Sequence, residues 1–120
     1  MSPATVVLGA SPKEDRYSNK AVRKLVAHGH AVIAVGLREG DIDGTPIVTD
    51  VPSDRTVDTV TMYMNAENQR VWEDRIVALK PRRIIFNPGA ENERLARAAA
   101  QAGISVEEAC TLVLLSTGQY

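Results

Sequence analysis

The sequence predicts one α/β domain with a doubly wound, mainly parallel sheet of five strands and helices on both faces. Short apolar runs alternate along the chain with longer amphipathic segments, and the connections between them are short. The length of 120 residues suits one domain, which we place over residues 1–120, and no repeat or low-complexity linker divides it.

The N-terminal part is predicted to form a strand, a helix and a second strand. Residues 4–9 are an apolar run that ends at a glycine, as in a strand buried on both faces. Ser18 is suited to cap a helix over residues 19–28. Residues 31–36 repeat the character of the first strand. One helix between two such strands implies parallel pairing and a right-handed crossover.

The middle of the chain is less regular. Turn residues occupy 41–46, and Ile47 and Val48 form a brief extended segment. Residues 57–63 are rich in β-branched and aromatic side chains and are predicted to be the third strand. Asn65 is suited to cap a helix over residues 66–79. The predicted inner face of that helix consists of Val71, Trp72, Ile76 and Leu79.

The C-terminal part continues the alternation. Residues 82–87 are the fourth predicted strand, a helix follows over 91–102, and 104–107 form a short fifth strand before a helical segment near 108–116. The third helix is expected to approach the sheet closely through the small residues Ala96, Ala99 and Ala100. This order is that of a Rossmann-like domain, in which ligands bind beyond the carboxyl ends of the strands.

Composition narrows the class of partner and the compartment. The formal net charge of -1 provides no basic field for nucleic acid or an anionic membrane. No apolar run approaches the roughly 20 residues that span a bilayer, and the N-terminus lacks the pattern of a secretory signal. A single cysteine excludes an internal disulfide and favours a reducing compartment. We therefore expect a cytoplasmic protein with a small-molecule partner.

The loop after the first strand is the first candidate binding site. It opens on a glycine, which lets backbone approach a phosphate, and it leads into a helix N-terminus that favours anions. The full dinucleotide fingerprint is absent, because its later glycines would fall at Ser11 and Glu14. A plain turn with solvated charges is the alternative. The candidate residues here are Gly9, Ala10, Ser11, Lys13, Arg16 and Tyr17.

Two further loops follow later strands. Gly36 and Arg38 come after the second strand, where proteins that bind NAD usually carry an acidic residue for the ribose hydroxyls. A basic residue there favours a phosphorylated ribose, as in coenzyme A or NADP, although a solvated pair of Arg38 with Glu39 is an equal alternative. After the fourth strand, a tight turn supplies the candidates Asn87, Pro88 and Gly89.

Motifs of catalysis and metal binding are missing from the sequence. No nucleophile elbow, paired carboxylates or phosphate-hydrolysis motif occurs, so we predict no catalytic residue. His28 and His30 flank a turn at the opposite end of the sheet without partners at metal spacing, and we predict no metal site. Cys110 follows the fifth strand and is either an accessory thiol at the ligand end or a buried core residue.

Several short motifs together resemble a known family. They are Val-Leu-Gly-Ala-Ser-Pro at 7–12, Arg-Tyr-Ser at 16–18, His-Gly-His at 28–30, Val-Asp-Thr-Val at 57–60, Ile-Ile-Phe-Asn-Pro-Gly at 84–89 and Glu-Ala-Cys-Thr at 108–111. In this order the chain resembles the compact CoA-binding domains, which are related to the CoA-binding domain of succinyl-CoA synthetase α subunits. The resemblance implies nucleotide phosphates at Gly9, Ala10, Ser11, Arg16 and Arg38. It implies binding without ligase activity.

Three functions remain open from the sequence. The leading one is a stand-alone, non-catalytic protein that binds CoA or acyl-CoA at the carboxyl ends of the strands. The alternatives are an NADP-type dinucleotide-binding protein and an interaction module that kept the fold without the ligand. An uncovered sheet edge or the alanine-rich helix face would support a homodimer.

Overall fold

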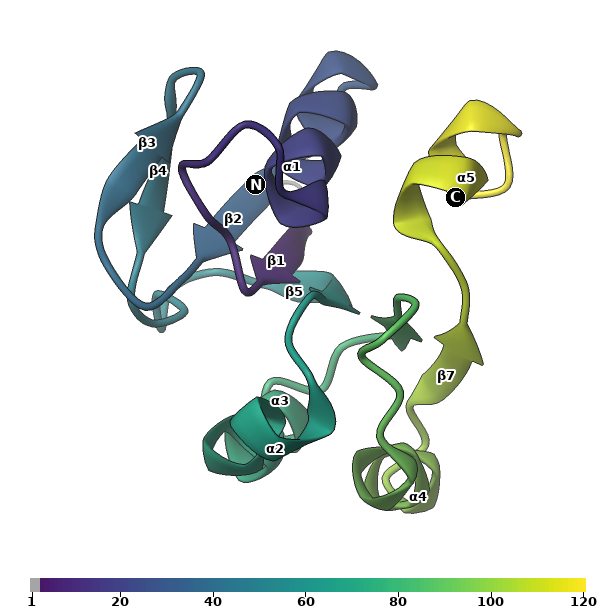
Figure 1. Ribbon diagram of the computed structural model, residues 1–120. Helices are drawn as coiled ribbons and strands as arrows, with labels where there is room; N and C mark the ends of the chain where they lie inside the picture. Colours follow the sequence, from purple (N-terminus) through teal and green to yellow (C-terminus); the bar gives the residue numbers. More distant parts are fainter. Residues whose placement is uncertain (1–2) are drawn as a thin grey trace.

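The computed structural model describes residues 3–120, which contain a single seven-stranded sheet. The strands are β1 (Ala4–Leu8), β2 (Val32–Val35), β3 (Gly40–Ile42), β4 (Thr45–Val48), β5 (Val57–Met62), β6 (Arg83–Phe86) and β7 (Ser105–Glu108). Their order in the sheet is β3-β4-β2-β1-β5-β6-β7. The chain therefore starts in the middle, runs outward on one side, and returns to build the other side beside β1 (Figure 1).

Helices cover both faces of this sheet. They are α1 (Tyr17–Ala27), α2 (Ala66–Gln69), the 3₁₀ turn η1 (Arg70–Trp72), α3 (Glu73–Ala78), α4 (Glu93–Gln101) and α5 (Thr111–Ser116). Helices α1 and α5 pack together on one face, and α2, α3 and α4 lie on the other (Figure 1). No helix within residues 3–120 is long and apolar enough to cross a membrane.

The central strands are apolar along their whole length because they are buried on both faces. Side chains alternate along a strand, so Val7 enters the cluster under α1 and α5, whereas Val6 and Leu8 enter the cluster under α3 and α4. Leu25 and Leu95 close the two clusters from the helix side. A double-faced core of this kind is the pattern that the continuous apolar runs predict.

The parallel register brings the carboxyl ends of the inner strands to one edge. Leu8 at the end of β1 pairs with Val35 at the end of β2 and with Met62 at the end of β5. Met62 in turn pairs with Phe86 at the end of β6. The loops that follow these four strands therefore begin side by side, and this edge is where a ligand site is expected.

The predicted count of five strands is wrong, since a hairpin of β3 and β4 adds two strands beyond β2. The turn between them contains Asp43 and Gly44, both with positive φ (50° and 91°), and the Gly44 amide donates to the Asp41 carboxylate at 3.0 Å. An Asp-Gly pair is the usual hairpin signal. The flanking strands are only three and four residues long, so their pattern predicted no more than a brief extended segment at Ile47 and Val48.

The helices also depart from the prediction in detail. Helix α1 begins at Tyr17, and Arg16 rather than Ser18 is its N-cap. The predicted continuous helix over 66–79 is interrupted by the η1 turn, whose three-residue period shifts the side chains that follow. Val71 lies within this turn and is 86% exposed, and Ala100 in α4 is exposed as well.

Two substitutions will distinguish the interrupted helix of the structure from the continuous helix that the sequence predicts. Ile76 is 2% exposed, so Ile76→Ala should lower the free energy of unfolding by about 2–5 kcal/mol. Val71→Ala should change it by less than about 0.5 kcal/mol, because the side chain is already in solvent. Urea denaturation followed by circular dichroism measures both values. Equal losses would restore a continuous helix with Val71 on its inner face.

Candidate binding site at the carboxyl edge of the sheet

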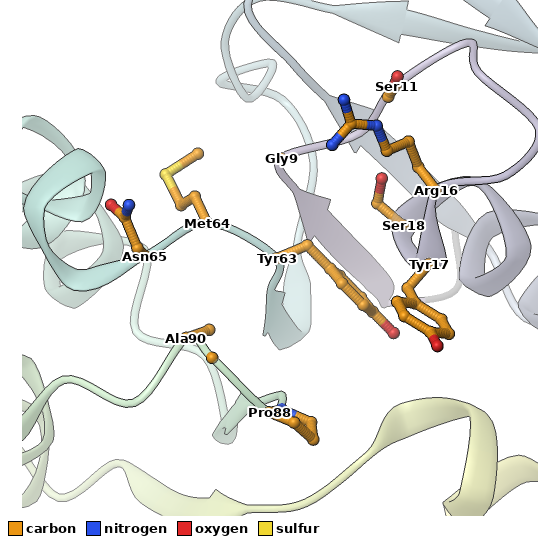
Figure 2. A pocket seen from close by; sticks show the side chains of 11 residues that line it. Gly9, Ser11, Arg16, Tyr17, Ser18, Tyr63, Met64, Asn65, Pro88 and Ala90 are labelled. Atoms are coloured by element: carbon orange, nitrogen blue, oxygen red, sulfur yellow. The ribbon is translucent and has the colours of Figure 1, made fainter.

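A cavity of about 290 Å³ opens at the carboxyl edge, between the loops after β1, β5 and β6 and the start of α1 (Figure 2). It is lined by Gly9, Ser11, Arg16, Tyr17, Ser18, Tyr63, Met64, Asn65, Pro88, Gly89 and Ala90. Residues from three separate parts of the chain therefore share one site. They meet because β1, β5 and β6 are neighbours in the sheet and end in register.

Two glycines allow the loops at this edge to pack backbone against backbone. A Cβ on Gly9 would lie 2.8 Å from the carbonyl oxygen of Tyr63, and one on Gly36 would lie 2.4 Å from that of Ala10. Gly9 also has a φ of +102°, which disfavours any other residue. The amides of Gly9 and Ala10 both donate to the Val35 carbonyl at 2.9 Å, so they brace the loop and are already engaged.

The N-terminus of α1 is the side of the cavity best suited to an anion. No side chain caps this helix and no acidic residue occupies its first turn, whereas Asn65 caps α2 and Asn92 caps α4. Within residues 3–120, Arg16 forms no ion pair, and Figure 2 shows its guanidinium pointing back toward Gly9. Unpaired positive charge and a helix dipole together favour a phosphate or carboxylate.

Buried Gln69 holds the two loops on the opposite side of the cavity. Its side-chain amide donates to the carbonyl oxygens of Met64 and Ala90, each at 2.7 Å, and its own oxygen accepts from Asn92 at 2.8 Å. Met64 and Ala90 both line the cavity. One side chain without solvent exposure thus fixes the spacing between the loops after β5 and β6.

Asn87 forms a second buried brace, between β5, β6 and α5. Its amide donates to the Thr61 hydroxyl at 2.6 Å and to the Met62 carbonyl at 2.8 Å. Its oxygen accepts from the Thr111 amide at 2.8 Å, and the hydroxyls of Thr61 and Thr111 pair at 2.8 Å. With 2% of its surface exposed, Asn87 supports the cavity from behind and does not line it.

The loop after β1 is tied to α1 in the same manner. The buried Asn19 donates to the Ser11 carbonyl at 2.9 Å and accepts from Arg23 at 2.8 Å. Arg23 also pairs with Glu14 of this loop and with Asp43 at the tip of the β3–β4 hairpin. The hairpin therefore reaches the loop that carries Ser11.

Comparison with known proteins identifies the family. The family described as "CoA binding domain" matches residues 4–116. This chain belongs to the CoA-binding domain family. The resemblance predicted from the sequence motifs is thereby confirmed. None of the curated proteins matches the chain in sequence.

Solved structures agree with this assignment at the level of the fold. A crystal structure of an uncharacterized protein is 42% identical, covers 100% of this chain and 99% of its own, and has a TM-score of 0.93. A hypothetical protein from Pyrococcus horikoshii OT3 is 18% identical over 94% of this chain and 81% of its own, with a TM-score of 0.86. A dinucleotide-forming acetyl-coenzyme A synthetase 1 from Ca. Korarchaeum cryptofilum, in complex with phosphate and ADP, is 17% identical. It covers 88% of this chain and 25% of its own, with a TM-score of 0.71.

The cavity of this CoA-binding domain brings together only some of the residues predicted from the sequence. Those that line it are Gly9, Ser11, Arg16, Tyr17, Pro88 and Gly89. Ala10 and Gly36 pack against each other beneath it. Lys13 and Arg38 are exposed outside it, and Asn87 lies behind it. Proximity to a strand end is thus necessary for a place in the cavity but not sufficient.

Five lining residues were not among the candidates. They are Ser18, Tyr63, Met64, Asn65 and Ala90. Three of them directly follow β5, a loop that carries no charge and no glycine and so offered no binding signal of its own. The signal that could have identified them is the place of their loop in the fold. A strand that pairs in parallel with β1 ends at the same edge of the sheet, so the loop that follows it begins there too.

Cys110 lies at the same edge but outside the cavity. It is the N-cap of the six-residue α5 and is half-buried. It does not line the cavity. Its role as an accessory thiol stays a prediction.

Substitution of glycines will test the close approach at the strand ends. Gly9→Ala and Gly103→Ala both place a side chain at positive φ, which costs about 1–2 kcal/mol of stability. Only at Gly9 does the new Cβ also meet backbone, so its loss should be about 1–3 kcal/mol larger. The difference between the two denaturation curves isolates the contact with Tyr63. Equal losses would show that this contact relaxes without cost.

Proposed function

We propose that this protein binds coenzyme A or an acyl-CoA in the cavity at the carboxyl edge of its sheet. The observation that carries the proposal is the match of the CoA binding domain family over residues 4–116, combined with a cavity at the strand ends where such folds bind nucleotides. CoA is an anionic nucleotide joined to a long neutral arm. The cavity offers a positively charged side and an uncharged side.

The phosphate groups are assigned to the side formed by α1. Arg16 supplies charge, Ser11 supplies a hydroxyl, and the first turn of α1 supplies amides that no side chain caps. A helix N-terminus with these properties favours a phosphate. The amides of Gly9 and Ala10 take no part in this proposal, because they are bonded to Val35.

The ligand must extend beyond the cavity. A volume of about 290 Å³ is at the lower end of the usual range for sites of small molecules, and CoA is larger than most of these. Part of the nucleotide therefore lies along the neighbouring strand ends. The loop after β2 adjoins the loop after β1 through the contact of Gly36 with Ala10, and it carries the exposed Arg38. Arg38 is the proposed partner of the ribose phosphate.

Binding without turnover is part of the same proposal. The side chains that line the cavity in the described part of the chain include no carboxylate, imidazole or thiol. General acid–base and nucleophilic catalysis rely mostly on such groups. The composition of the wall therefore supports a carrier, sensor or regulatory role over a catalytic one.

Thermal shift with a panel of nucleotides tests the ligand class. CoA and acetyl-CoA should raise the melting temperature more than NAD, NADPH or ATP at the same concentration. A ligand at 100 times its dissociation constant stabilises the folded state by about 2.7 kcal/mol, which is readily measured. Preference for NADPH would favour the dinucleotide alternative. No shift with any ligand would favour an interaction module.

Two arginine substitutions test how the phosphates are held. Arg38→Ala should weaken CoA by about 1.5–3 kcal/mol, the scale of a hydrogen bond to a charged group, and should leave dephospho-CoA nearly unchanged. Arg16→Ala should weaken both ligands by similar factors, because its proposed partner is retained in dephospho-CoA. Isothermal titration calorimetry measures all four affinities. Equal losses of the two ligands in Arg38→Ala would remove the ribose phosphate as its partner.

A further inference from the structure

Tyr63 is one of the residues that line the cavity. It follows the last residue of β5, and its amide donates to the Leu8 carbonyl at 2.8 Å, which continues the pairing with β1. Its backbone lies against Gly9. The side chain lines the cavity and also packs on the apolar cluster under α1 and α5. Both its backbone hydrogen bond and the packing of its side chain therefore fix the position of Tyr63.

The hydroxyl of Tyr63 is buried and has no hydrogen-bond partner within the described residues. Two hydroxyls, those of Thr61 and Thr111, lie near enough to lower the pKa of Tyr63 against the larger effect of burial, although neither forms a well-aligned hydrogen bond with it. The hydroxyls of Thr61 and Thr111 pair with each other at 2.8 Å, and that of Thr61 also accepts from Asn87 at 2.6 Å. A buried hydroxyl without a well-formed hydrogen bond recovers little of the hydration that it loses, whereas a phenylalanine would avoid that loss. Because the residue lines the cavity, an acceptor on a bound ligand is one way to complete its hydrogen bonding.

The chemistry of this hydroxyl restricts what it can contact. Burial raises the pKa of Tyr63 to about 12, so the group keeps its proton at neutral pH and is available as a donor. The ring is packed against apolar residues, and the nearest unpaired positive charge of the cavity belongs to Arg16 on α1. An anion binds more favourably near the positive charge at α1 than in the apolar surroundings of Tyr63. We therefore expect the acceptor for Tyr63 to be uncharged.

We propose that the Tyr63 hydroxyl donates a hydrogen bond to a carbonyl oxygen in the neutral, thiol-bearing arm of CoA. This assignment rests on the proposed function and adds a contact that determines specificity for the arm rather than for the nucleotide. The arm contains amide carbonyls, and an acyl-CoA adds that of the thioester. Each is an uncharged acceptor of the required kind.

The ring of Tyr17 is the part of the cavity wall that we expect to move when the arm binds. Figure 2 shows the Tyr63 side chain pointing from the end of β5 toward Tyr17. Tyr17 is the first residue of α1 and is 68% exposed, so its ring is held by few contacts and moves at little cost. Displacement of this ring by the arm of the ligand would uncover the Tyr63 hydroxyl.

Tyr63→Phe tests the assignment with two ligands and one stability measurement. The ligands are CoA and adenosine 3′,5′-bisphosphate, which has the same phosphorylated nucleoside but lacks the arm. The variant should bind CoA about 3- to 10-fold more weakly and the bisphosphate unchanged, by isothermal titration calorimetry. Its melting temperature without ligand should be equal to or above that of the wild type, because an unpaired hydroxyl has been removed.

Tyr120→Phe is the matched control. The Tyr120 hydroxyl bonds to Thr5 near the start of β1, at the opposite end of the strand. Its removal should lower the melting temperature and leave both affinities unchanged. A wild type that binds neither ligand would refute the proposed function and this contact with it. A wild type that binds CoA, with Tyr63→Phe unchanged or equally weakened toward both ligands, would refute the contact alone.

Discussion

The carboxyl edge of the sheet depends on buried side-chain amides that satisfy backbone carbonyls at the strand ends and in the loops that follow them. A carbonyl that leaves a strand loses its ladder partner, and if it is buried without a donor it destabilises the fold. The side-chain amides donate hydrogen bonds to these carbonyls: Gln69 to those of Met64 and Ala90, Asn87 to that of Met62, and Asn19 to that of Ser11. Each amide joins segments that are distant in sequence or separated by a loop. The loops can therefore stay open at the edge without losing their shape.

This arrangement separates support from recognition. The bracing side chains Gln69, Asn87 and Asn19 are nearly inaccessible to solvent, whereas Arg16 and Tyr17 at the rim are exposed. A charged or aromatic rim residue can change its side-chain contacts when a ligand binds, because that side chain is exposed and not packed in the core. A buried amide cannot do so without leaving several polar groups unpaired. A rigid floor under an adaptable rim is suited to a ligand that is long and only partly enclosed.

Much of the fold could be predicted because it follows from local pattern. Apolar runs bounded by glycine gave the central strands, and residues 4–8 alternate between the two core clusters as a doubly buried strand must. The hairpin of β3 and β4 could not be predicted with the same rule. Its strands are only three and four residues long, too short to show an alternating pattern. They are held by pairing with β2 and with each other and by burial of Ile42 and Ile47. Helix periodicity failed where the η1 turn altered the phase, which left Val71 in solvent.

The sequence by itself determined that strands and helices alternate, that a ligand is expected at the strand carboxyl ends, and that Gly9 permits a close backbone approach. These properties depend on residue type and on neighbours along the chain. Only the tertiary structure decided which side chains face the cavity, because that depends on how loops from separate strands meet. Asn87 and Gly89 are two residues apart, yet the first turns inward to Thr61 and the second lines the cavity. Tyr63 looked like a strand residue, and only the pairing of β5 with β1 placed it among the residues that line the cavity.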